Sequence, residues 1–352
     1  MKYVKILCVT IVIVLVMTLL IYGVRFNHLL GQFEIDDILE HTRLDMDEVD
    51  DEDYGNMGPS YNVDPNKPAV SDESIINILL VGCDAASVDE RGRSDSMMIA
   101  TIDMKHKSLK LTSLLRDTYV ELPGNNKNGT PYGWKKLNTA YAAGDASFLI
   151  DTIAHNYNIQ IDKYAVVNFS LFREIVDIIG GVEIELSKEE AAYIRGRALH
   201  EAGPNRKKAK AGLNLLDGWM ALEFARCRMV GGFTYTDADG NKVTVNNDYA
   251  RTARQRYVIQ QIFNKMKDQD LNSLLSIAER CMEHTRTNIS IAELGVYLQN
   301  VLSIETKEIK QLQIPAAGTF ETDKITTASV LWMSQENWIK NVETLHRFIF
   351  ET

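Results

Sequence analysis

The chain has 352 residues, of which 45% are hydrophobic and 24% charged, and this composition indicates a globular protein with a sizeable core and excludes collagen-like, disulfide-stapled and wholly disordered classes. The formal net charge of −10 argues at first against a broad phosphate-binding surface. However, of the 48 acidic and 38 basic residues, 11 acidic residues and one arginine lie between Glu34 and Asp53, which leaves 37 of each sign elsewhere.

The first predicted element is a membrane-spanning helix at residues 6–24, which contain no charged side chain and follow Lys2 and Lys5. At ~1.5 Å per residue this helix is roughly 28 Å long, close to the ~30 Å hydrocarbon core of a bilayer. A cleaved signal peptide is the alternative, but no small-x-small cleavage site follows the apolar run. The lysines before the helix and the acidic residues after it place residues 1–5 in the cytoplasm, so we expect a single-pass protein of the cell membrane with an extracytoplasmic C-terminal part.

Residues 25–71 are predicted to be an extracytoplasmic linker, because they combine the acidic stretch with Gly55, Pro59 and Pro65. A binding role for this segment is the alternative. The pattern changes at Ile75, and residues 72–352 are predicted to form one domain of catalytic size.

Strands and helices alternate through most of this domain. Helices separate the later strands, so the predicted fold is α/β with a central mixed sheet that is covered on both faces. Apolar, β-rich runs predict strands at 75–81, 97–102, 109–115, 164–169, 182–186 and 309–314. Helical spacing predicts helices at 137–143, 148–154, 171–179, 215–225, 249–267, 271–282, 291–302 with Ser290 as its cap, and 338–350.

Charged residues gather between the first two predicted strands. Asp84 follows the first strand, and Arg93 and Asp95 come shortly before the second. Open α/β sheets build their sites just past strand ends, and two carboxylates there could hold a hard cation such as Mg²⁺. The alternative is that Asp84 makes a turn and Asp95 pairs with an arginine, and the spacing alone leaves both open.

Ionic residues also follow the third predicted strand. Arg116 and Asp117 come directly after it, so we expect them at the same sheet edge as Asp84. A structural salt bridge between the two is the alternative. Lys136 lies in a loop that enters a helix, from which a lysine could reach an anion as a point charge.

The strongest local pattern joins Arg226 and Arg228, at the end of one predicted helix, to the start of the next. At roughly 100° per residue, Asp248, Arg251 and Gln255 lie within about 60° of one another on that second helix. Since the apolar stripe of the helix continues the same line, we expect these polar side chains to face the sheet or a cleft. The stripe consists of Ile259, Ile262 and Met266.

Two further arginines of this helix lie off that line. Arg254 is about 60° further round, and Arg256 is predicted to point into water. Buried arginines must be paired, and the arginines here outnumber the nearby carboxylates. An anion with several oxygens would neutralise the excess positive charge, and a pyrophosphate held by bidentate guanidinium contacts is the simplest such anion. A network of structural ion pairs is the alternative.

Three cysteines lie in the predicted extracytoplasmic domain, and three cannot all pair with one another. Cys83, Cys227 and Cys281 lack the close Cys and His spacings of a zinc site, so small buried side chains are expected. One disulfide, between Cys83 and Cys227, stays open because both residues adjoin the charged motifs.

Eight strings in this sequence resemble the LytR-CpsA-Psr family of bacterial cell-wall enzymes. They occur in the family's order within a motif core at 75–266, and the resemblance thins toward the C-terminus. The strings are Ile78–Asp84, Gly92–Met98, Leu115–Val120, Lys136–Asn138, Val166–Phe169, Val176–Val182, Arg226–Arg228 and Asp248–Gln255.

The resemblance implies a phosphotransferase on the outer face of the cell membrane, with a three-layer α/β/α sandwich and a hydrophobic groove for a polyprenyl tail. Such enzymes move an anionic glycopolymer, of the teichoic acid or capsular polysaccharide type, from a polyprenyl-pyrophosphate carrier to N-acetylmuramic acid of peptidoglycan. The implied partners are therefore the lipid-linked polymer, peptidoglycan and the cell membrane, and no nucleic acid is expected.

Carried over by motif, Asp84 and Asp95 would bind Mg²⁺, for which Mn²⁺ is the substitute. Asp117 is the candidate general base. The implied catalytic residues are Arg116, Asp117, Arg226 and Arg228, and the implied pyrophosphate-binding residues are Arg93, Arg116, Lys136, Arg226, Arg228, Arg251, Arg254 and Gln255.

Two other functions compete with this one. The first is a membrane-tethered protein that binds wall polymer or regulates without chemistry. The second is a metal-dependent polyprenyl-pyrophosphate pyrophosphatase, in which water is the acceptor. The pair Asp84 and Asp95 favours chemistry over binding, because a pure anion receptor gains nothing from carboxylates beside phosphate unless a cation lies between them.

Overall fold

The structure of the chain is a computed structural model. The predicted membrane helix at 6–24 and nearly all of the linker lie outside the residues that it describes, as do Asp84 and Arg93. Among the residues that are described, no helix is both long and apolar enough to cross a membrane. The described residues are 68–83, 94–198, 209–228, 230–236, 242–267, 269, 273–274, 277, 285–304, 308–325 and 328–351.

A six-stranded mixed sheet forms the centre of the domain, with the strand order β11-β6-β1-β2-β3-β12. β1 pairs with β6 in parallel and with β2 antiparallel, and β3 pairs with β2 antiparallel and with β12 in parallel. The prediction of a central mixed sheet is confirmed. The strands are β1 (Ile75–Cys83), β2 (Ser94–Asp103), β3 (Ser108–Leu114), β6 (Lys163–Asn168), β11 (Arg286–Thr287) and β12 (Lys310–Ile314).

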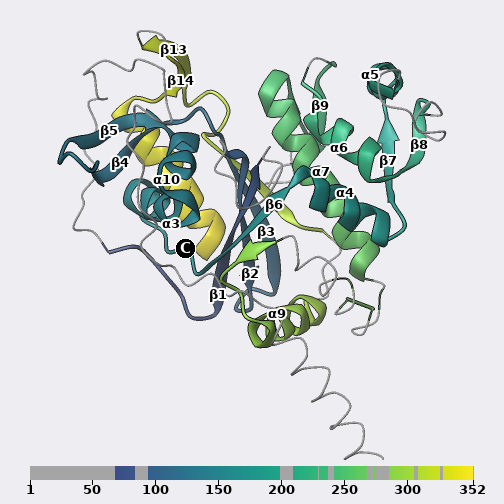
Figure 1. The fold of residues 1–352 in the computed structure, drawn as a ribbon, viewed down its shortest axis with the longest axis horizontal. Coiled ribbons are helices and arrows are strands. Elements are labelled where there is room, and N and C mark those ends of the chain that lie inside the picture. Colours follow the sequence, from purple (N-terminus) through teal and green to yellow (C-terminus); the bar gives the residue numbers. More distant parts are fainter. Residues whose placement is uncertain are drawn as a thin grey trace, which may run out of the picture.

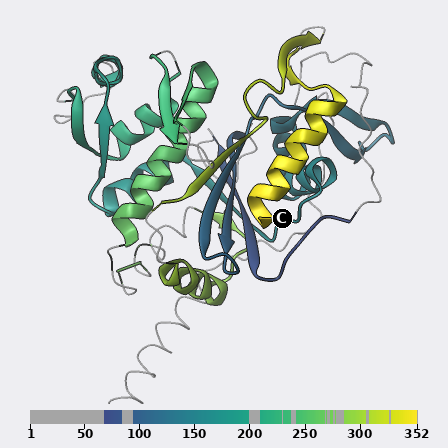
Figure 2. The same cartoon turned by 180° about the vertical axis from the view of Figure 1, so that it is seen from behind.

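Side chains alternate between the two faces of the sheet, as the period of two along a strand requires. Leu79 and Val81 of β1 pack into a large core beneath two helices, α3 (Leu137–Tyr157) and α10 (Gln335–Phe350). Ile78 packs on the opposite face, against α7 (Asn247–Lys267) and α9 (Ile291–Ser303). Figures 1 and 2 show α3 and α10 on one side of the sheet and α7 on the other, so the three-layer arrangement is confirmed.

A second core lies beyond α7, around Val258. It is built from short helices and a two-stranded ribbon of β7 and β8, and it carries α6, whose last turn leads into the candidate site. Its elements are α4 (Phe169–Ile178), β7 (Val182–Leu186), α5 (Lys188–Ala198), β8 (Gly212–Leu216) and α6 (Gly218–Arg226).

The helix predicted to begin at Leu215 in fact begins at Gly218. Leu215 pairs with Glu183 in the ribbon of β7 and β8, so this residue belongs to a strand. Asp217 is the N-cap, because its side chain accepts a hydrogen bond of 2.8 Å from the backbone N–H of Met220. The sequence prediction was wrong because it read the apolar residues of β8 as the first turn of the helix.

The break predicted between two helices near residue 145 is present as a kink within α3. Gly144 and Asp145 have non-helical backbone angles, and Asp145 has a positive φ of 67°. A Cβ atom on Gly144 would lie 2.5 Å from the Cβ of Phe148, so glycine is required by the close approach. The ribbons that the sequence analysis did not predict are β4 (Tyr119–Asn125) with β5 (Pro131–Lys136), β9 (Phe233–Thr236) with β10 (Lys242–Val245), and β13 (Glu321–Ile325) with β14 (Ala328–Trp332).

Candidate functional site

The site lies at the edge of the sheet where β1 and β3 end and β2 begins. Because β2 runs antiparallel to both neighbours, Asp95 near its start and Arg116 just after β3 come to the same edge. Arg116 donates a hydrogen bond from Nη1 to Oδ1 of Asp95. The structure therefore confirms the shared edge, and it also forms the ion pair that was the alternative for Asp95.

The N-terminal turn of α7 adds a tightly held arginine to this edge. The guanidinium of Arg251 donates to both carboxylate oxygens of Asp248, over 2.8 and 2.9 Å, and to the backbone carbonyl of Asp95 over 3.0 Å. Its side chain is only 4% exposed. Burial opposes ionisation of Asp248, but the hydrogen bonds and charge of Arg251, with the charges of Arg116 and Arg228, outweigh it and lower the pKa of this carboxyl group.

Arg228 brings a third guanidinium to the cluster. Its Nε lies 3.4 Å from Oδ1 of Asp248, and its side chain is 43% exposed. Burial and the positive charges of Arg251 and Arg116 lower the pKa of Arg228, although Asp248 and Asp95 act in the opposite direction. Repulsion among these three arginines is relieved when an anion binds between them, so the site has the electrostatic character of an anion receptor.

Asp117 and Lys136 extend the cluster on the other side of Arg116. Asp117 lies 3.5 Å from Nε of Arg116 and 3.8 Å from Nζ of Lys136, and Lys136 is the last residue of β5. Burial opposes the charge on Arg116, but the carboxylates of Asp117, Asp95 and Asp248 outweigh it and raise the pKa of this guanidinium. The predicted general base is thus beside the anion site, between two cations.

Gln255 lies one helical turn after Arg251 and faces the sheet, as predicted. Its Oε1 accepts a hydrogen bond of 3.1 Å from the hydroxyl of Ser96 on β2. Both residues line a narrow gap between α7, β2 and β3, together with Asp95 and Arg116. The sequence analysis did not single out Ser96, although its place two residues into β2 puts it on the same face as the site.

Arg226 approaches from the last turn of α6 and is held more loosely. Its guanidinium lies 4.6 Å from the centroid of the Phe169 ring, and its Nη1 lies 3.9 Å from Glu223. The side chain is 40% exposed, so it can turn toward a ligand. The contact between Phe169 and Arg226 was not predicted from the sequence. The feature that could have suggested it is that Phe169 ends the string Val166–Phe169, which resembles the family.

Arg254 has a different environment from the other predicted ligands. It is fully buried, its Nε donates to Glu190 over 2.7 Å, and its two Nη atoms donate to the backbone carbonyls of Cys227 and Val230 over 3.2 and 2.9 Å. These bonds fix the segment that follows α6, and with it Arg228. Glu190 was not predicted as a partner of Arg254, because the charged sequence Lys188–Glu190 is typical of an exposed helix surface.

Arg256, which was predicted to point into water, is buried, so this prediction was wrong. Its Nη1 donates to the hydroxyl of Ser113 over 2.8 Å, its Nε donates to Gln311 over 3.2 Å, and its guanidinium lies 5.0 Å from the centroid of the Tyr235 ring. α7 is covered by the sheet and by the ribbon of β9 and β10, so more than one of its faces is buried. Desolvation lowers the pKa of Arg256 to about 10.

Cys83 and Cys227 are both buried thiols, and they do not form the disulfide that the sequence left open. Cys83 packs in the core beneath α3, whereas Cys227 follows α6. Their role in the structure is that of small buried side chains, which was the other expectation.

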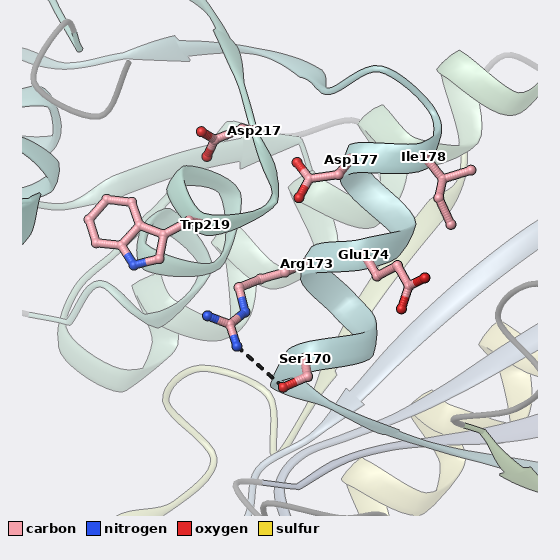
Figure 3. A pocket seen from close by; sticks show the side chains of 7 residues that line it. All are labelled: Ser170, Arg173, Glu174, Asp177, Ile178, Asp217 and Trp219. Carbon is pink, nitrogen blue, oxygen red and sulfur yellow. Dashed lines mark hydrogen bonds between the residues drawn. The ribbon is translucent and has the colours of Figure 1, made fainter. Parts of the chain in front are cut away.

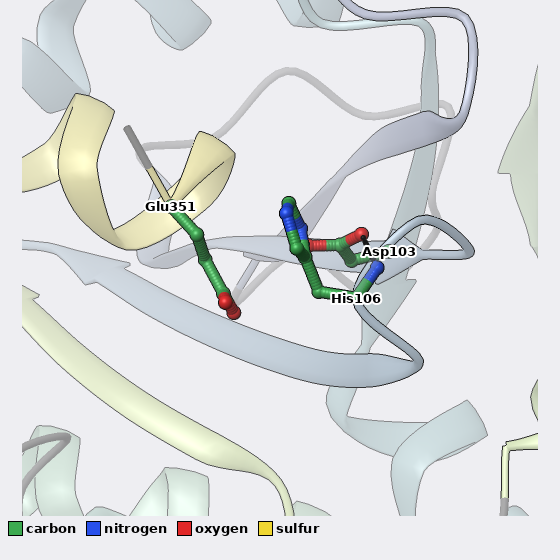
Figure 4. Close-up of side chains that lie close together, drawn as sticks. All are labelled: Asp103, His106 and Glu351. Carbon is green, nitrogen blue, oxygen red and sulfur yellow. Dashed lines mark hydrogen bonds and ion pairs between the residues drawn. The ribbon is translucent and has the colours of Figure 1, made fainter.

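Only one of the two carboxylates predicted to bind Mg²⁺ lies among the described residues. Asp95 offers one hard oxygen donor at the correct edge, as Mg²⁺ prefers, and its partner Asp84 lies outside them. A second group with the spacing of metal ligands, Asp103, His106 and Glu351, lies at the opposite end of β2 (Figure 4). There the ammonium group of Lys110 lies 2.6 Å from Asp103 and 3.1 Å from Glu351, so a cation already occupies the centre of that group.

The model of the LytR_cpsA_psr family matches residues 42–347. The chain belongs to this family. Its fold matches the crystal structure of TagV from Bacillus subtilis with a TM-score of 0.60 and 25% identity, over 80% of this chain and 100% of that one. It also matches the family protein YwtF (TagT) with bound octaprenyl pyrophosphate, with a TM-score of 0.58 and 19% identity, over 84% of this chain and 100% of that one, which shows a shared fold.

Among characterised family members, the chain is 32% identical over 249 residues to the polyisoprenyl-teichoic acid–peptidoglycan teichoic acid transferase TagU of Enterococcus faecalis, covering 69% of this chain and 70% of that protein. It is 31% identical over 264 residues to biofilm regulatory protein A of Streptococcus mutans, covering 74% of this chain. It is 29% identical over 250 residues to the transferase TagV of Bacillus subtilis, covering 69% of this chain. The chain spans 61% and 57% of the length of these last two relatives.

Proposed function

We propose that this LytR_cpsA_psr family member is a membrane-anchored phosphotransferase, which moves an anionic glycopolymer from a polyprenyl-pyrophosphate carrier to peptidoglycan. The observation that carries the proposal is a cluster of arginines at the sheet edge, from which half-buried apolar side chains continue along α7 and β1. A polyprenyl pyrophosphate has a matching arrangement, because its anionic head group is attached directly to a long apolar chain.

The arginine cluster matches the pyrophosphate. Arg116 and Arg251 lie close enough to Arg228 to lower its pKa, and Lys136 adds a fourth cation. Guanidinium groups bind phosphate oxygens through paired, charge-assisted hydrogen bonds. Because Asp248 and Asp95 already hold Arg251 in place, that side chain needs little reorganisation when the ligand arrives.

The apolar surface matches the lipid. On α7, Ile259 and Phe263 follow Gln255 at helical spacing, and they pack half-buried against the sheet. On β1, Leu80 and Ile76 line the same face and are also only half-buried. From Arg251 to the end of α7 this track is roughly 24 Å long at ~1.5 Å per residue, enough to cover several prenyl units.

The chain's own residues would act mainly by positioning and by neutralising charge, which is what phosphoryl transfer requires. Arg251 and Arg116 would fix the diphosphate. Arg226 and Arg228, which are 40% and 43% exposed, would close on the transferring phosphoryl group. Asp117 would accept the proton of the attacking sugar hydroxyl, whose oxygen bonds to the phosphorus that carries the polymer. The bond from that phosphorus to the bridging oxygen of the diphosphate breaks, and polyprenyl phosphate leaves. Asp84 and Asp95 would hold Mg²⁺, which when bound supplies further charge neutralisation.

The names of the relatives support a teichoic acid type of polymer and peptidoglycan as the acceptor. We extend this to N-acetylmuramic acid as the acceptor sugar and to a location at the outer face of the cell membrane. The apolar, uncharged residues 6–24 support membrane anchoring, and a substrate that is itself held by a lipid needs an enzyme at the same surface.

A regulatory protein without chemistry is the second candidate, since biofilm regulatory protein A is among the relatives. One assay separates the candidates. The full chain in detergent is incubated with a radiolabelled polyprenyl-pyrophosphate glycopolymer and insoluble peptidoglycan, with Mg²⁺ or with EDTA. We expect Mg²⁺-dependent radioactivity bound covalently to peptidoglycan. Release of soluble polymer alone would indicate a pyrophosphatase, and an unchanged substrate would indicate a binding protein.

A further inference from the structure

A polar cavity of about 660 Å³ lies between α4 and the start of α6, outside the anion site (Figure 3). Ser170, Arg173, Glu174 and Asp177 line it from α4, where their spacing puts them on one helical face. Trp219 of α6 lies across from them. The cavity is open to solvent along this face, since Ser170 and Asp177 are exposed.

A second cavity, of about 310 Å³, continues the first. Asp177 and Asp217 line both cavities, and beyond them the second one passes Gly181 and reaches Asn214 and Leu215 of the β7–β8 ribbon. We call the two together the α4 groove. From Ser170 to Ile178 the groove follows α4 for roughly 12 Å at ~1.5 Å per residue, so it is long and open rather than closed around a small molecule.

One end of the α4 groove adjoins the proposed reaction centre. Ser170 directly follows Phe169, and the guanidinium of Arg226 lies 4.6 Å from the Phe169 ring centroid. α6 connects the two places, because its N-terminal turn carries Trp219 and its last residue is Arg226. A polymer lying in the groove would therefore present its end, or one of its sugars, to Arg226.

The charges of the groove exclude the donor polymer. Three carboxylates, from Glu174, Asp177 and Asp217, line the groove together with one guanidinium, from Arg173. A polyanion such as a teichoic acid would be repelled by this surface, whereas a neutral ligand that offers hydrogen-bond donors would not.

The carboxylates are also held ready to accept hydrogen bonds. Asp177 Oδ1 accepts from the backbone N–H of Gly218 over 2.7 Å, and Asp217 Oδ1 accepts from that of Met220 over 2.8 Å. A carboxylate has about four acceptor sites, so each fixed group keeps capacity for a ligand. Leu215, which is 58% exposed, and Ile178 add apolar contact area beside them. Hydroxyl donors combined with apolar faces are the surface chemistry of a sugar chain.

We propose that the α4 groove binds the neutral glycan strand of peptidoglycan and delivers one of its hydroxyl groups to the reaction centre beside Arg226. This inference rests on the proposed function, because it names the surface for that reaction's acceptor. It assigns donor and acceptor to surfaces of opposite charge, the arginine cluster for the lipid-linked polyanion and the acidic groove for the glycan.

The test uses the full chain in detergent and soluble glycan strands from which the stem peptides have been removed. The lactyl carboxyl groups that this frees are converted to amides, so that the strands are neutral. Glu174→Lys reverses a charge in the groove, and Ser170→Trp fills it near Phe169. Glu343→Lys is the matched control, since Glu343 is an exposed helical glutamate on α10. By titration calorimetry we expect both groove variants to bind the glycan at least tenfold more weakly than the control, with unfolding midpoints unchanged.

In the transfer assay the groove variants should raise the KM for the glycan at least tenfold and leave the KM for the lipid-linked donor unchanged. Equal glycan binding by both groove variants and the control would overturn the inference, as would a selective loss of affinity for polyglycerol phosphate. If no variant transfers polymer but the groove variants still lose glycan binding, the proposed function fails and the groove assignment stands.

Discussion

Arg228 and Arg251 carry the same charge and contact the same carboxylate, but they differ in burial, so their removal should have different effects. Arg251 is 4% exposed, and it makes two hydrogen bonds to Asp248 and one to the carbonyl of Asp95. Arg228 is 43% exposed and lies 3.4 Å from Asp248. Both are proposed to bind the diphosphate, so both Arg228→Ala and Arg251→Ala should weaken ligand binding.

The expected magnitudes follow from these contacts. A hydrogen bond to a charged group contributes about 1.5–3 kcal/mol, so each substitution should weaken pyrophosphate binding roughly 10- to 100-fold. Breaking a buried pair costs about 3–5 kcal/mol of folding stability, and because Asp248 keeps Arg228 nearby we expect about 3 kcal/mol for Arg251→Ala. An exposed pair contributes about 0–1 kcal/mol, so Arg228→Ala should leave stability within about 1 kcal/mol of the parent.

Two measurements on the full chain in detergent check this contrast. Titration with geranylgeranyl pyrophosphate gives the affinity, and urea unfolding followed by tryptophan fluorescence gives the stability. Arg347→Ala on α10, away from the site, is the control for loss of one arginine charge. The reasoning is refuted if Arg228→Ala destabilises the fold as much as Arg251→Ala, or if Arg251→Ala weakens binding while stability stays that of the parent.

Because the pKa of Asp248 is lowered in the folded protein, its ionised form stabilises the fold above the ordinary pKa of about 4. This stabilisation is lost as the pH falls through the lowered pKa. In urea unfolding measured from pH 7 to 3, the free energy of unfolding of the parent should therefore fall by an amount that is absent from Asp248→Asn. Arg254→Met leaves the buried carboxylate of Glu190 without its guanidinium, and it should lower the free energy of unfolding by about 3 kcal/mol in the same assay. Because Arg254 also holds the segment after α6, the transfer rate should fall at least tenfold. Wild-type stability in this variant would contradict the positioning role. Asp95→Asn should raise the Mg²⁺ concentration needed for half-maximal transfer at least tenfold, and an unchanged Mg²⁺ titration would remove Asp95 from the metal site.

The sequence was sufficient to predict the elements whose apolar pattern is strong. β1 and β2 contain unbroken apolar stretches, β3 alternates leucines with polar residues, and α7 has a sustained helical period, so each was located to within a few residues. The short ribbons were missed because most of their strands are brief or are interrupted by polar residues, Pro or Gly. β8 was read as part of α6 because two leucines directly precede the N-cap Asp217.

The sequence also predicted that charged residues would meet at one edge of the sheet. Strand order and direction explain why this succeeded: residues that follow β1 and β3, or precede β2, share an edge wherever these strands are neighbours. Asp95 and Arg116 do meet there, and Asp248, Arg251 and Gln255 share the face of α7 that helical periodicity gives them.

Only the tertiary structure decided which arginines stay exposed at the sheet edge and which are buried in ion pairs and hydrogen bonds within the protein. Helical periodicity gives the direction of a side chain about the axis of α7, but it does not say which directions other elements cover. Arg256 was therefore predicted in water, although the sheet and the β9–β10 ribbon enclose it, and Arg254 meets a glutamate 64 residues earlier in the chain. The sequence alone predicted a group of arginines at one edge of the sheet, and packing from distant segments determined which of them remain exposed.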